Sequence, residues 1–117
     1  MNLNKAKQAC RKLPGATEDI KWTDHLVFSI GGKMFAVADV DEKSTSIRFK
    51  VDDDRFLELT DRPGIIPAPY LARSKWIRVE DMRSLADAEA EQLLRRAYEL
   101  VFSKLTKKLQ REIEGAA

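Results

Sequence analysis

The sequence predicts a single α+β domain in which a mostly antiparallel sheet carries helices on one face. Three observations support this fold class: several stretches alternate between apolar and polar residues, a Gly-Gly pair joins two of them directly, and apolar stripes of helical spacing lie near both ends. Strands joined by a tight turn pair antiparallel. At 117 residues the chain can bury one core but not two, so we expect one domain over 1–117, with its core at about 3–108.

An amphipathic helix is predicted first, because apolar residues recur every three or four positions until Pro14-Gly15 ends the pattern. Cys10 lies on the apolar stripe, so we expect it to be a small core residue. It is the only cysteine, which excludes an intramolecular disulfide and a CxxC metal or redox site. The full stripe consists of Leu3, Ala6, Cys10 and Leu13.

A β-hairpin is predicted next, because Gly31-Gly32 separates two runs of strand-forming residues. Both central positions of a type I′ turn need positive φ, which glycine adopts freely. Uninterrupted pairing from this turn places Phe28 opposite Phe35 and Leu26 opposite Val37 on a face that should pack against the helices. We expect the second face to be half-exposed, with the smaller residues His25, Val27, Ser29, Met34, Ala36 and Ala38.

Two further strands are predicted from alternation at 46–51 and 75–79. One side of each strand is apolar and should be buried: Ile47, Phe49, Val51, Ile77 and Val79. The other side should then face away from the core and carries Arg48, Lys50, Trp76 and Arg78.

A short helix is predicted between these strands, with Asp52 as its N-cap and Phe56 and Leu59 facing inward. A long helix should follow the last strand, starting at a capping box formed by Ser84 and Asp87. Its apolar face extends to Leu105. The pattern then fades, so we expect residues 107–117 to form a fraying end.

The sequence carries no catalytic constellation. His25 is the only histidine and has no partner that spacing identifies, and the acidic stretches lack the spacing of zinc or calcium ligands. We therefore expect no catalytic residue, no metal site and no cofactor. There is also no apolar run long enough to span a bilayer, so we expect no membrane partner and a cytoplasmic location.

The best candidate for function is a basic surface that also carries aromatic side chains. The net charge is only +2, but five cations and two acids fall within residues 62–83. Cations attract phosphates and an exposed ring can stack on an unpaired base, so this grouping suits nucleic acid. Two other interpretations stay open: a solvated face with Trp76 covered by the Pro67/Pro69 loop or by the long helix, and a protein-docking site.

Several short motifs, in this order and spacing, resemble the MmcQ/YjbR-like family of small bacterial proteins: Leu13-Pro14-Gly15, Gly31-Gly32-Lys33-Met34-Phe35 and Lys75-Trp76. The resemblance implies an α-β(3)-α-β(2)-α domain similar to the secretion-chaperone-like class, with a fifth strand near 65–71. It also implies DNA binding by a "double wing" arrangement, without enzymatic activity or cofactor. The chain departs from the family where a histidine and an asparagine are replaced by Leu71 and by Ala72 or Arg73.

Together, the residues and the resemblance predict a non-enzymatic domain that binds DNA weakly and in a salt-sensitive manner. The alternative is a protein-interaction or chaperone-like adaptor module. The candidate nucleic-acid-binding residues are Lys33, Arg48, Lys50, Tyr70, Arg73, Lys75, Trp76 and Arg78.

Overall fold

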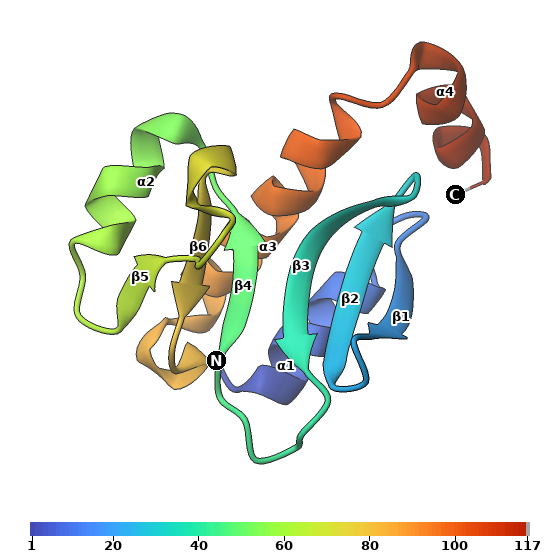
Figure 1. The fold of residues 1–117 in the computed structure, drawn as a ribbon. Coiled ribbons are helices and arrows are strands. Elements are labelled where there is room, and N and C mark those ends of the chain that lie inside the picture. Colours follow the sequence, from blue (N-terminus) through green and yellow to red (C-terminus); the bar gives the residue numbers. More distant parts are fainter. Residues whose placement is uncertain (117) are drawn as a thin grey trace.

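A computed structural model describes residues 1–116, and over these residues the chain forms one six-stranded sheet and four α-helices (Figure 1). The strand order is β1-β2-β3-β4-β6-β5, and all neighbours are antiparallel. The strands are β1 (Thr17–Lys21), β2 (His25–Ile30), β3 (Lys33–Asp39), β4 (Ile47–Lys50), β5 (Ile65–Pro67) and β6 (Trp76–Val79). The helices are α1 (Leu3–Arg11), α2 (Asp53–Thr60), α3 (Asp87–Phe102) and α4 (Lys107–Ala116), with 3-10 turns η1 (Ala72–Ser74) and η2 (Met82–Ser84).

The main core lies between the sheet and the helices α1 and α3, which cross behind it in Figure 1. We call this side of the sheet the helix face. The alternation predicted for 46–51 and 75–79 is confirmed in β4 and β6, because the side chains expected to point inward are buried in this core. Cys10 is fully buried, as predicted, and burial raises the pKa of its thiol to about 12. The apolar residues of the two strands in this core are Ile47, Phe49, Ile77 and Val79.

The hairpin forms around Gly31-Gly32 as predicted, but its register is correct only beside the turn. Ser29 pairs with Met34, and a β-bulge then shifts the pairing so that Phe28 lies opposite Ala36 rather than Phe35. Because the bulge adds a residue, Phe35 and Ala36 both join the helix-face core. Beyond the bulge the predicted faces are therefore wrong for β3, since Ala36 and Ala38 face the helices and Val37 faces the opposite side, while those of β2 are confirmed.

The opposite side of the sheet carries a second apolar cluster, so the expectation that it is half-exposed is wrong. We call this side the loop face, because residues 68–75, between β5 and β6, fold back over it. Ala68 and Trp76 pack there against Val27 and Val37, and Trp76 is only 4% exposed. Trp76 points away from the helices, as predicted, but the loop covers it. Of the two positions that the sequence left open for Trp76, the structure has the buried one, beneath the loop that contains Pro69.

Strand β1 was not expected from the sequence. All five of its residues are exposed, so it shows no apolar alternation, and it pairs with β2 along the edge of the sheet. The connection uses a turn in which two non-glycine residues, Trp22 and Thr23, have positive φ. At the other edge, the strand expected near 65–71 is present as β5, which is only three residues long.

The C-terminal part also differs from the expectation. Helix α3 begins after Ala86, whose backbone is extended, while Ser84 belongs to η2, so the proposed capping box is wrong. Residues 107–116 form α4 rather than a frayed end, and residue 117 lies outside the described part of the chain. Leu105, Leu109 and Ile113 lie against the hairpin turn and Gly15, which holds this segment in place. Within residues 1–116, no helix combines the length and hydrophobicity needed to cross a membrane.

Candidate nucleic-acid interface

Two arginines lie directly opposite each other on the loop face. Arg48 of β4 pairs with Arg78 of β6, and both side chains are half-buried. Within residues 1–116, neither guanidinium has a carboxylate oxygen within 4.0 Å, and the Nε of Arg78 is buried without a hydrogen-bond partner. Like charges directly opposite on neighbouring strands are unfavourable. The pair therefore leaves positive charge and hydrogen-bond donors unused at the centre of this face.

The remaining predicted cations are also without acidic partners, in contrast to several arginines elsewhere. Arg62 binds Glu89 at 2.8 Å and Arg96 binds Asp52 at 2.9 Å, for example. In the described part of the chain, none of the six cations predicted for the site forms an ion pair: Lys33, Arg48, Lys50, Arg73, Lys75 and Arg78. Their positive charge is therefore not neutralised by direct contact within this domain.

Lys50 lies beneath the loop that covers the face. Its ammonium Nζ donates a 2.6 Å hydrogen bond to the carbonyl oxygen of Ser74. Desolvation, and then the nearby charge of Lys104, lower the pKa of Lys50, while Asp53 opposes the shift. Lys104 follows α3 and was not predicted for the site, because the sequence does not reveal that this helix ends beside β4.

Tyr70 and Arg73 lie on the outer surface of the 68–75 loop, and both are exposed. Their positions follow from the neighbouring residues Ala68 and Leu71, which pack inward on the second cluster. Arg48, Arg78, Arg73 and Tyr70 thus belong to one side of the molecule. We call this set, together with Lys50, the basic surface.

Three of the predicted site residues do not belong to the basic surface: Lys33, Lys75 and Trp76. Lys33 pairs with Ile30, which faces the helices, so it lies at the hairpin tip on the helix-face side. Lys75 directs its Nζ over the ring of Phe56 in α2, 5.1 Å from the ring centroid. Trp76 is buried beneath the loop and cannot stack on a ligand in this conformation.

His25 has neighbours that the sequence did not identify. Its Nδ1 lies 2.6 Å from a carboxylate oxygen of Asp24, and its Nε2 lies 3.9 Å from one of Asp39. The exposed ring of Trp22 meets it edge to face at 5.7 Å. This cluster is at the opposite end of β2 from the Gly-Gly turn. A strand register was needed to find it, because Asp39 comes from β3.

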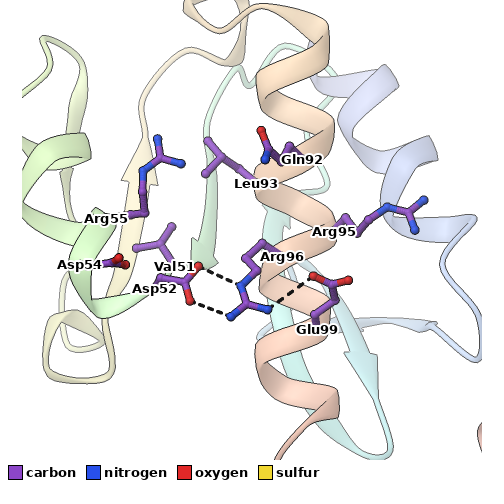
Figure 2. A pocket seen from close by; sticks show the side chains of 9 residues that line it. All are labelled: Val51, Asp52, Asp54, Arg55, Gln92, Leu93, Arg95, Arg96 and Glu99. Carbon is purple, nitrogen blue, oxygen red and sulfur yellow. Dashed lines mark hydrogen bonds and ion pairs between the residues drawn. The ribbon is translucent and has the colours of Figure 1, made fainter.

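A cavity of about 530 Å³ lies between α2 and α3, and no residue of the basic surface lines it (Figure 2). Its charges are largely paired: Arg96 donates two hydrogen bonds of 2.9 Å to Asp52 and lies 3.5 Å from Glu99. The Arg96 hydrogen bond lowers the pKa of Asp52. Asp52 precedes α2 as predicted, but its side chain binds Arg96 instead of capping the helix. Neither His25 nor Tyr70 lines this cavity. Across residues 1–116, no group of three or more metal-ligating side chains comes together.

The fold is similar to that of solved structures. A Deinococcus radiodurans protein, DR2400, described as a DUF419 domain, has a crystal structure with 27% identity and a TM-score of 0.84, covering 99% of this chain and 94% of that one. A structural genomics target from Pseudomonas syringae has 23% identity and a TM-score of 0.69, covering 86% and 99%. A search of curated proteins finds no significant match. The YjbR family model matches residues 11–100, and the chain therefore belongs to the YjbR family.

Proposed function

We propose that this protein binds DNA through the basic surface, chiefly by contacts to phosphates. The observation that carries the proposal is the Arg48–Arg78 pair, in which two cations face each other without a carboxylate beside them. The Nε of Arg78 is buried, but the terminal nitrogens of the two guanidinium groups could donate hydrogen bonds to a phosphate oxygen, whose charge would relieve the repulsion between them.

The surrounding residues support a polyanion rather than a single small anion. Arg73 and Lys50 add positive charge beside the arginine pair, and Lys104 approaches Lys50 from the end of α3. Contacts of this kind read the backbone and not the base sequence. Binding should therefore be weak, largely independent of sequence and strongly reduced by salt.

The test is fluorescence anisotropy with labelled oligonucleotides over a series of salt concentrations. Loss of two phosphate contacts in Arg48→Gln/Arg78→Gln should weaken binding and reduce the slope of log K against log salt by about two. Arg83→Gln is the matched control, because Arg83 is exposed but already paired with Asp81 at 2.8 Å. Absence of binding at tens of micromolar protein in low salt would refute the proposal, as would an equal effect of the control.

A second candidate function is protein interaction at the β1 edge. Ile20 and Trp22 are 62% and 63% exposed there, and large aromatic residues are common at binding hot spots. A stoichiometric partner recovered in a nuclease-treated pull-down, and lost with Trp22→Ala, would favour this function over DNA binding.

A further inference from the structure

Tyr70 is the most exposed large hydrophobic residue in the described part of the chain. Its relative exposure is 104%, so the ring makes almost no contact with the protein. Its backbone has a φ of 67°, in the left-handed region that few non-glycine residues adopt. A fully exposed aromatic ring at an unfavourable backbone position does not stabilise the fold. Such a ring is expected where it contacts another molecule.

The loop that carries this ring is tightly held. The amide of Ala68 donates to the carbonyl of Trp76 at 3.0 Å, and the amide of Trp76 donates to the carbonyl of Leu71 at 3.2 Å. The side chains of all three residues pack into the second apolar cluster. The ring of Tyr70 is therefore presented outward from a fixed base, which limits the entropy lost when it binds a ligand.

The charges around Tyr70 indicate what the ring would meet. Arg73 is exposed three residues later, and the half-buried Arg48 and Arg78 occupy the same side of the sheet. None of these cations has an acidic partner within residues 1–116. Tyr and Arg are also enriched at protein-binding hot spots, but Lys is depleted there, and Lys50 and Lys104 add cations on this side of the sheet. An exposed ring beside several cations is typical of surfaces that bind single-stranded nucleic acids.

We propose that the preferred ligand is single-stranded DNA, with Tyr70 stacked on an unpaired base while the arginines hold the adjacent phosphates. This inference rests on the proposed DNA-binding function and specifies its substrate. In a duplex the faces of the bases are stacked on one another and cannot be reached, so a protruding ring contributes to binding only where a base is unpaired.

The experiment compares a 20-nucleotide oligo-dT with a 20-base-pair duplex in the anisotropy assay. The wild-type protein should bind the single strand several-fold more tightly. Tyr70→Asn should reduce that affinity by about 5- to 100-fold and leave duplex binding unchanged, since stacking on one base is lost. Asparagine is chosen because it tolerates positive φ, and Tyr70→Phe is the matched control that keeps the ring.

The outcomes separate this inference from the function on which it rests. Equal affinity for both oligonucleotides, or an unchanged single-strand affinity in Tyr70→Asn, overturns single-strand recognition while leaving DNA binding intact. A loss in Tyr70→Phe as large as in Tyr70→Asn also overturns it, because the ring would then not be the reason. Failure of the wild type to bind either oligonucleotide overturns both. Thermal unfolding of each variant should match the wild type, which shows that the loop has not been lost.

Discussion

The two faces of the sheet bury apolar side chains in different ways. The helix face is covered by α1 and α3, and its core holds large fully buried residues such as Phe28 and Phe49. The loop face is covered only in part, by one short loop over a small cluster around Trp76, and it exposes unpaired cations beside that cluster. Charge and burial are therefore combined on the loop face: the helix face buries the larger core, and the loop face joins a small buried cluster to a surface suited to an anionic partner.

The largest effect is expected when a side chain is removed from the loop-face cluster, which tests whether that cluster stabilises the fold. Trp76→Ala should lower the free energy of unfolding by about 3–5 kcal/mol, because a buried aromatic side chain is removed and leaves a cavity. Tyr70→Ala, on the same loop but fully exposed, should change it by at most about 0.5 kcal/mol. Urea denaturation measures both. Similar losses for the two variants would show that the loop does not cover Trp76 in solution.

Acrylamide quenching of tryptophan fluorescence independently tests whether Trp76 is buried in this cluster. In a Trp22→Phe background only Trp76 remains, and its fluorescence should be quenched far less than that of Trp22 in a Trp76→Phe background. Equal quenching would contradict the difference in exposure between the two indoles.

A smaller effect concerns the hairpin turn that α4 covers. Gly31 and Gly32 both have positive φ, but a Cβ on Gly31 would lie 2.6 Å from Leu105, whereas a Cβ on Gly32 would meet nothing within 4 Å. Both alanine variants share the backbone strain, so Gly31→Ala should lose about 1–3 kcal/mol more than its matched control, Gly32→Ala. Equal stability in urea denaturation would mean that α4 does not pack on the turn.

The smallest effect involves Asp52 and Arg96, which hold α2 against α3. The folded-state pKa of Asp52 is below its ordinary value of 3.8, so the pair stabilises the protein above that pH and the contribution is lost as pH falls through the lower value. Arg96→Gln should therefore cost at most about 1 kcal/mol at pH 7, because both groups are partly exposed. Its unfolding free energy should converge on that of the wild type in strong acid. A cost that persists there would point to packing instead.

Sequence reasoning succeeded where one side of an element is strongly apolar. The strands around Phe49 and Ile77, the Gly-Gly turn and the burial of Cys10 follow from local periodicity. It failed where tertiary contacts decide the outcome. Strand β1 is exposed throughout and has one apolar residue, Ile20, so it exists because β2 offers an edge, and α4 is ordered by contacts with the hairpin.

The candidate site shows the same division. The direction of Arg48 and Arg78 could be predicted, since alternation fixes which side of a strand each residue occupies. The exposure of Trp76 could only be left open, because it depends on how residues 68–75 fold over the sheet. The bulge at Phe35 likewise moves Val37 to the loop face, where it supports that loop, and no local pattern marks it.

The contact between α4 and Gly31 also bears on the order in which the protein is made. The hairpin emerges from the ribosome early, but Leu105 and Leu109, which cover its turn, are synthesised much later. Until then the apolar surface around the turn stays open to solvent and to other chains. A chain interrupted before α4 would keep its strands yet expose this surface, which makes truncated products candidates for aggregation and proteolysis.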